Sequence, residues 1–136
     1  MIRPICRDAL LLSRKAAPAT ALDLPVAADL ADTLRANSDR CVGMAANMIG
    51  VPKRIICVAV GPMVLTMLNP VIVKQSGAYE AEEGCLSLMG VRKTTRYRTI
   101  EVRWQDASFQ WRQCTYEGFT AQIIQHEMDH LEGVLI

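Results

Sequence analysis

The sequence predicts an α+β domain in which β-strands from the middle of the chain pack with helices on either side of them. Its 136 residues, 51% of them apolar, fit a single domain that spans residues 1–136 and buries a sizeable core. Short apolar or alternating runs between residues 54 and 116 are typical of strands. Helix-spaced apolar residues occur before these strands, at residues 23–37, and after them, from Phe119 onward.

Composition limits the partners and the compartment of the protein. A net charge of +1 argues against nucleic acid or an anionic membrane as an obligatory partner. The five cysteines show no paired spacing and no secretion signal precedes them, so we expect free thiols and a cytoplasmic location. The apolar run at residues 9–12 falls short of the roughly 7 to 15 residues of a signal core.

The segment before the expected strands has the features of a helix. Asp23 can cap its N-terminus, and Pro25 is suited to its first turn. Inward-facing side chains recur at helical spacing up to about Asn37, at Val26, Leu30, Thr33 and Leu34. We interpret this helix as part of the scaffold, because apolar residues at helical spacing normally mark a core face.

Small residues are concentrated at residues 41–51, and they are Gly43, Ala45, Ala46 and Gly50. Such residues let a ligand or a strand come close to the backbone. From the residues alone, this segment is either a tight turn before the next strand or the wall of a binding site.

One uncharged stretch has nearly the length of a membrane-spanning helix, because residues 55–73 carry no charge over 19 positions. A Gly-Pro pair at residues 61–62 and an Asn-Pro pair at residues 69–70 interrupt it. We therefore expect two buried strands, at residues 54–60 and 63–68, and a third strand that begins after the Asn-Pro pair. No membrane span is expected.

Charged residues precede and follow residue 85. An acidic run is formed by Glu80, Glu82 and Glu83, and such a run is normally a solvated bend. The alternative is a position beside a metal site with a thiolate ligand, where these carboxylates could orient a metal-binding histidine. The cations that follow are Arg92, Lys93, Arg96 and Arg98, and we expect most of them to be solvated.

Two further strands are expected before the last helix. Residues 96–104 alternate as a half-buried strand does, with one face formed by Arg98, Ile100, Val102 and Trp104. Residues 109–116 are typical of another strand. Glu117 and Gly118 then lead into a helix, and Gly133 is expected to end it.

A His-Glu-x-x-His pattern lies in this last helix, within residues 125–131. His126 and His130 are four residues apart, so a helix presents both imidazoles on one face as a pair of metal ligands. Glu127 is rotated away from the metal ligands, where its carboxylate can act as a general base. The alternative is a solvated helix whose histidines have this spacing by accident. The two histidines of the chain both lie in this motif, which favours metal binding.

Hydrolytic metal sites of this kind use three protein ligands, so a third ligand is needed. After His130 the sequence offers only Glu132, which faces away, and no other histidine exists, so we expect a carboxylate or a cysteine from upstream. The cysteines are Cys6, Cys41, Cys57, Cys85 and Cys114. Cys57 lies in an apolar run, where a thiol is usually packed. Cys85 follows Gly84 in a polar segment that leaves the sulfur accessible, so it is the expected third ligand.

Three motifs together resemble those of the peptide deformylases. Residues 83–87, Glu-Gly-Cys-Leu-Ser, and residues 125–131, Gln-His-Glu-Met-Asp-His-Leu, are similar to the second and third motifs of that family. The first motif of the family, Gly-x-Gly-Leu-Ala-Ala-x-Gln, is similar to residues 41–48. Order and spacing extend the resemblance over nearly the whole chain. The chain departs from the family at Cys41, where the family has glycine, and at Met48, where it has glutamine.

The resemblance implies a peptide-deformylase-like fold, with antiparallel strands around a central metal-binding helix. It also implies a metallohydrolase that releases formate from the N-terminus of formyl-methionyl peptides, with nascent chains at the ribosome as substrate. One divalent ion is implied, commonly Fe(II), with zinc or nickel tolerated. The metal, held by Cys85 and the two histidines, would activate water. Glu127 would move the proton, and the backbone N–H of Leu86 would help to hold the oxyanion.

The resemblance further implies contacts to the bound peptide, at Val42, Gly43, Met44, Met48, Gly84, Arg92 and Gln122. Gln122 stands where the family tends to have an aliphatic residue in a pocket that takes methionine.

Two other classes of function stay open beside the enzyme. A structural metal module would need four protein ligands, whereas the sequence offers three and an unused Glu127. A silent relative would bind formylated peptide N-termini without turning them over, and Met48 motivates this alternative because a thioether has no N–H to donate.

Overall fold

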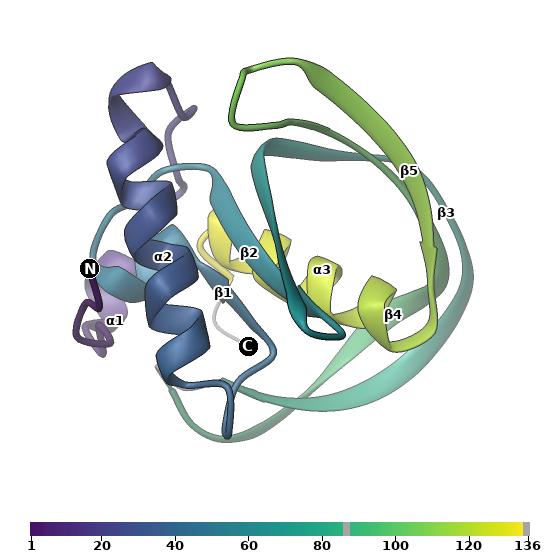
Figure 1. Cartoon of the computed structure of the whole chain (residues 1–136). Helices are drawn as coiled ribbons and strands as arrows, with labels where there is room; N and C mark the ends of the chain where they lie inside the picture. Colours follow the sequence, from purple (N-terminus) through teal and green to yellow (C-terminus); the bar gives the residue numbers. More distant parts are fainter. Residues whose placement is uncertain (86–87, 135–136) are drawn as a thin grey trace.

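The computed structural model describes residues 1–85 and 88–134. Within these ranges five strands form one sheet in the order β1-β2-β3-β4-β5, and neighbouring strands are antiparallel. The strands are β1 (Gly43–Ala45), β2 (Ile55–Val60), β3 (Met63–Cys85), β4 (Leu88–Gln105) and β5 (Trp111–Glu117). The helices are α1 (Ala9–Leu12), α2 (Leu24–Ala36) and α3 (Gly118–Leu131), with 3-10 turns η1 (Ala21–Asp23) and η2 (Ala46–Ile49). This arrangement confirms the predicted α+β class (Figure 1).

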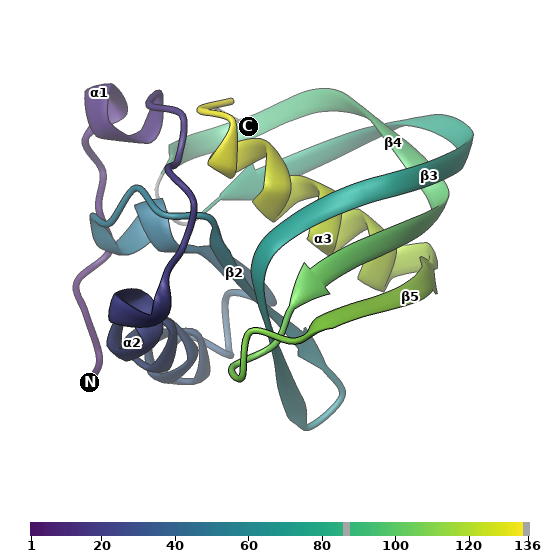
Figure 2. The same cartoon turned by 90° about the horizontal axis from the view of Figure 1, so that it is seen from above.

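The sheet curls around α3, the helix that carries the His-Glu-x-x-His pattern. Figures 1 and 2 show β3, β4 and β5 bending around this helix. The buried side chains between sheet and helix include Ile56, Val58, Met67, Ile100, Val102, Trp104, Ala121, Ile124 and Leu131. Because α3 buries apolar residues against a curved sheet, the position of its polar face is fixed by the core.

Strand β2 lies between two helices, which explains its uninterrupted apolar sequence. Ile56 and Val58 belong to the cluster around α3, whereas Ile55 and Cys57 pack in a second cluster with α2. Successive strand residues point to opposite faces, so a strand covered on both sides needs apolar residues at every position. The expected burial of Cys57 is thus confirmed.

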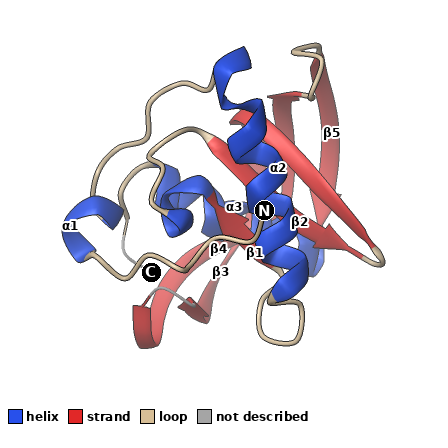
Figure 3. Ribbon diagram, turned by 60° about the vertical axis from the view of Figure 1, so that its left-hand side comes forward, coloured by secondary structure: helices blue, strands red, loops and turns tan. Residues whose placement is uncertain are grey.

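Helix α2 confirms the expected scaffold helix. It starts directly after Asp23, has Pro25 in its first turn, and ends at Ala36. The Asp23 side chain does not cap it as expected, because its carboxylate accepts from the N–H of Thr20 instead of from the helix. Its buried residues are Ala27, Leu30, Ala31, Thr33 and Leu34, and the apolar ones pack in one cluster with residues of β2 and η2. Figure 3 shows α2 beside β2. In the described ranges, no helix is long and apolar enough to cross a membrane.

The expected break at residues 69–70 is wrong, because β3 runs through it. Its first part pairs with β2 as far as Leu68, and its later part pairs with β4. The register shifts between Leu68 and Val71, and Asn69 takes a left-handed φ of 50°. A bulge therefore accommodates Pro70, which has no N–H for the ladder, and the strand bends instead of ending.

The acidic run is also not the expected bend, because residues 80–83 continue β3. Glu83 is buried, with 8% of its surface exposed, and Arg96 on β4 is 3% exposed instead of solvated. Burial of these two charges is tolerated because they pair with each other. On β4, Ile100, Val102 and Trp104 are buried as expected, whereas Arg98 is exposed.

Candidate metal centre

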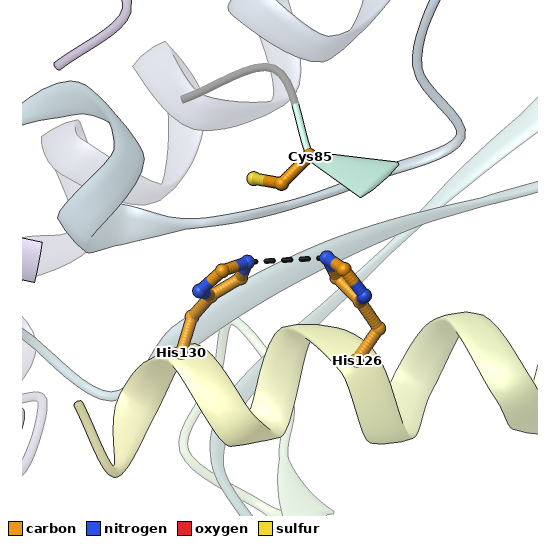
Figure 4. A group of neighbouring side chains, drawn as sticks. All are labelled: Cys85, His126 and His130. Atoms are coloured by element: carbon orange, nitrogen blue, oxygen red, sulfur yellow. Dashed lines mark hydrogen bonds between the residues drawn. The ribbon is translucent and has the colours of Figure 1, made fainter. Parts of the chain in front are cut away.

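The two histidines of α3 face each other across one turn of the helix. His126 Nε2 lies 3.1 Å from His130 Nε2, and the rings meet nearly edge to face (Figure 4). Both side chains are buried. A tetrahedral metal with bonds of about 2.0 to 2.1 Å separates two nitrogen ligands by about 3.3 Å, so this distance matches a shared metal.

Cys85 completes the group from the end of β3. The sulfur of Cys85 and one nitrogen from each of His126 and His130 all lie within 4.8 Å of one another. Figure 4 shows the Cys85 side chain extending over the gap between the two imidazoles. A thiolate and two imidazoles suit Fe(II), zinc or nickel, and three protein ligands leave a coordination position for water. The residues therefore fit a catalytic divalent metal.

The two imidazoles differ in their environments. Burial, together with the nearby charge of His126, lowers the pKa of His130 to about 4, so His130 is neutral and has a lone pair for a metal. Burial opposes protonation of His126, but hydrogen bonds with Cys85 and Glu83 outweigh it and raise the pKa of His126 to about 10. A metal must displace that proton, because an imidazole binds metal only through a free lone pair.

The surroundings of the Glu127 carboxylate suit a general base. Its side chain is 4% exposed, and its Oε1 is a buried oxygen without a hydrogen-bond partner in the described structure. Burial raises the pKa of Glu127 to about 7. A buried polar atom normally has a partner, so this oxygen fits a site for a water molecule or a substrate group.

Glu83 is the acceptor at the centre of a buried network behind His126. Its Oε1 lies 2.7 Å from His126 Nδ1, and its carboxylate also accepts from Arg96 and Gln122. Burial alone would raise the pKa of Glu83, but hydrogen bonds from His126, Arg96 and Gln122 hold it at about 2. The structure thus contains the contact that the sequence suggested as an alternative role for the acidic run, a carboxylate that orients a metal-binding histidine.

A cavity of about 570 Å³ opens beside these groups. Five of the seven expected peptide-contact residues line it, namely Val42, Gly43, Met48, Gly84 and Gln122. The Met48 sulfur also accepts a hydrogen bond of 3.4 Å from the N–H of Ala45. Residues 41–51 therefore include a cavity wall.

Two expected contact residues lie elsewhere. Met44 is fully buried in the cluster around α2, because successive residues of a strand face opposite sides and Gly43 is the residue of β1 that faces the cavity. Arg92 stands opposite Glu83 in the β3-β4 ladder and is not among the residues that line the cavity. Leu86, the expected oxyanion donor, lies outside the described residues.

The sequence interpretation missed Arg96 and several residues of the cavity wall, which are Arg40, Cys41, Phe119 and Ile123. Arg96 did carry a signal. It has the same strand parity as Ile100 and Val102, so the alternating pattern places a cation on the inner face of β4. A cation on an inner face requires a buried anion, and Glu83 supplies it.

The chain is similar to known proteins over its whole length. The model of the family described as polypeptide deformylase matches residues 3–136. A peptide deformylase from Clostridium beijerinckii is 57% identical over 136 residues, which is 100% of each chain. A peptide deformylase from Caldanaerobacter subterraneus is 36% identical over 129 residues, covering 92% of this chain and 80% of that one.

Solved structures are similar in fold. The Met-Ala-Ser-bound class I type b peptide deformylase from Acinetobacter baumannii has a TM-score of 0.88 at 30% identity, and the match covers 99% of this chain and 97% of that one. The peptide deformylase from Thermus thermophilus has a TM-score of 0.88 at 34% identity, over 99% of this chain and 84% of that one.

Proposed function

Because this chain belongs to the polypeptide deformylase family, we propose that it removes the formyl group from formyl-methionyl peptides with one divalent metal ion. We assign the metal to Cys85, His126 and His130. The observation that carries the proposal is the cluster of these three ligands beside a cavity that Cys85, His126 and Glu127 line, together with the unpartnered oxygen of Glu127. The fold and the hydrolase class are those that the sequence predicts.

When bound by these three residues, the metal would supply a Lewis acid for water activation near neutral pH and for polarisation of the formyl group. Glu127 takes the proton from the attacking water, because its free Oε1 is available, and it then gives this proton to the leaving amine. The products are formate and a peptide with a free N-terminal methionine.

The cavity wall has the task of binding and orienting the peptide. Val42 precedes β1, Gly43 is the first residue of β1, and Gly84 lies near the end of β3, so two strands offer backbone groups to the wall. The N–H of Leu86 is our proposed donor to the oxyanion. Met48 lines the same cavity but has no N–H in its side chain to donate.

The proposal also covers the identity of the metal ion, the natural substrates and the cellular compartment. Fe(II) is our choice for the working ion, with zinc and nickel as substitutes, because a thiolate and two imidazoles suit all three. The proposed substrates are nascent chains at the ribosome, the proposed compartment is the cytoplasm, and residues 1–136 act as one domain.

The test is a formate-release assay on protein purified without oxygen and loaded with Fe(II). A formyl-methionyl tripeptide is incubated with loaded protein, chelated protein and reloaded protein, and formate is measured beside peptide affinity. We expect formate from loaded and reloaded protein and none from chelated protein. Tight peptide binding without formate would show a silent binder instead. A bound metal that exchanges no water would show a structural module.

A further inference from the structure

We propose that Gln122 is a positioning residue that holds Glu83 in place and thereby fixes the two metal-binding elements relative to each other. The inference rests on the proposed function only in its choice of Cys85, His126 and His130 as ligands. Its starting point is a hydrogen bond of 2.9 Å from Gln122 Nε2 to Glu83 Oε2. The other oxygen of the same carboxylate, Oε1, lies 2.7 Å from His126 Nδ1.

Glu83 bridges one turn of α3. Gln122 and His126 are four residues apart, so both side chains lie on one face of the helix, and each contacts a different oxygen of Glu83. Glu83 lies on β3 two residues before Cys85. The carboxylate therefore joins the strand that carries the thiol ligand to the helix that carries the imidazole ligands.

Arg96 holds the same carboxylate from β4. Its Nε lies 3.1 and 2.9 Å from the two oxygens of Glu83, and its Nη2 lies 2.7 Å from Oε1. Its Nη1 donates to Asp129 at 2.5 Å. Arg96 thus fixes Glu83 to the sheet, whereas among the described hydrogen bonds Gln122 is the one that ties Oε2 to the helix.

Tyr79 fixes the orientation of the Gln122 amide. The Tyr79 hydroxyl lies 3.4 Å from Gln122 Oε1, and the Tyr79 ring packs under the guanidinium of Arg98. A carboxylate accepts hydrogen bonds only, so the Gln122 atom that faces Glu83 must be the NH₂ group, and this leaves Oε1 to accept from Tyr79.

The consequence concerns the metal. With Glu83 held in place, His126 donates its Nδ1–H to the carboxylate and keeps the lone pair of Nε2 for the metal. Without the Gln122 bond, Glu83 can turn about its contact with Arg96, and the orientation of His126 and the separation between β3 and α3 become less defined. Partners that orient a ligating histidine are worth roughly 10 to 100-fold in metal affinity.

The experiment replaces the metal with Co(II) and compares wild type with Gln122→Met, which has a similar length but no N–H donor. The readouts are the visible absorption bands of Co(II), which report its ligand geometry, and the rate at which a chelator removes it. We expect shifted bands and roughly tenfold faster release, at the low end of the effect of such partners. Gln122→Leu repeats the loss of the donor with a different side-chain shape, and we expect the same direction.

The matched control is Gln113→Met. Gln113 Nε2 also donates to a carboxylate, that of Glu101, but on the exposed strand β5. This variant should keep the wild-type bands and release rate. Wild-type bands and release in both folded Gln122 variants would overturn the positioning role. Neither readout needs peptide turnover, so failure of the proposed function would appear separately, as a loaded wild-type protein that releases no formate.

Discussion

Met48 stands where the first motif of the resembled family has glutamine, and the structure places it at the cavity. Its side chain is 1% exposed, and its sulfur accepts from the Ala45 N–H. The neighbouring amide of Asn47 is directed elsewhere, because Asn47 Nδ2 donates to the carbonyl of His130 and Asn47 is not among the residues that line the cavity. Under the proposed function, the oxyanion would therefore have one preorganised donor fewer than it would have with glutamine.

We predict that Met48→Gln raises kcat on a formyl-methionyl peptide and changes KM less. The new amide can accept from Ala45 and donate toward the oxyanion, and one such donor is worth roughly 10² to 10³ in rate. Met48→Leu, which adds no donor, should keep the wild-type kcat. If a folded, metal-loaded Met48→Gln variant has the kcat of wild type, the enzyme stabilises its transition state without this position, and melting measured alongside shows whether the buried amide costs stability.

An experiment can distinguish the role of Glu127 as a base from the role of the metal ligands. Glu127→Ala should lower turnover by roughly 10² to 10⁴, the usual contribution of a positioned general base, and leave the metal content unchanged. Its Oε1 makes no hydrogen bond in the described structure, so the substitution leaves no partner of that oxygen unsatisfied. Metal content by elemental analysis and formate release check the prediction. Metal loss equal to the activity loss would make Glu127 a ligand.

For single residues, the helix spacing predicted that His126 and His130 lie together on one face, and elimination among the cysteines led to Cys85. Spacing could not reveal that Glu83 is buried, or that Arg96 is buried whereas Arg98, at the same strand parity, is exposed. The burial of each charge depends on the other, and the two are paired across strands that a linear pattern does not align. The Met44 side chain is buried in the cluster around α2 and does not line the cavity, because Gly43 and Met44 are adjacent in β1 and neighbouring Cβ positions face opposite sides of a strand.

Among the elements, β1 and α3 come unusually close together, and Gly43 makes this possible. A Cβ at Gly43 would lie 2.6 Å from Ile123 Cγ2 and 2.8 Å from Glu127 Oε2. No real side chain fits at such distances without displacing its neighbours. The glycine therefore lets the strand lie against the helix at the point where the base is held.

Gly43→Ala should destabilise the fold by about 1 to 3 kcal/mol, as overpacking usually does, and lower formate release by displacing Glu127. Thermal unfolding and turnover of the metal-loaded variant are the measurements. Gly84→Ala is the control for unfolding, because its Cβ would meet only the Gly90 carbonyl at 3.5 Å, an ordinary contact. A Gly43→Ala variant with wild-type thermal unfolding and wild-type turnover would show that β1 can move away from α3 at little cost in free energy.

Elements with a clear period were predictable, and α2, α3 and β2 lie close to their expected ranges. The full length of β3 was not predictable, because Pro70 normally ends a strand and only the bulge at Asn69 shows that this one continues. A bulge is fixed by pairing with two neighbouring strands, which local sequence does not contain.

The whole molecule brings together ligands that are far apart in the sequence. Cys85 is on β3 and both histidines are on α3, and the curl of the sheet around this helix places the end of β3 against the histidine face (Figures 2 and 4). The same curl leaves the cavity open beside Glu127. The family motifs predicted which residues meet, and the curvature that makes them meet is a property of the complete sheet.

The most direct test of the metal assignment compares two cysteines of the same cavity. Cys41 and Cys85 both line it, yet only Cys85 belongs to the ligand group found among the described residues. Metal content and formate release are measured on wild type, Cys41→Ala and Cys85→Ala. We predict one metal per chain and formate release in wild type and Cys41→Ala, and loss of both in Cys85→Ala. Full metal occupancy in Cys85→Ala, with loss in Cys41→Ala, would contradict the account.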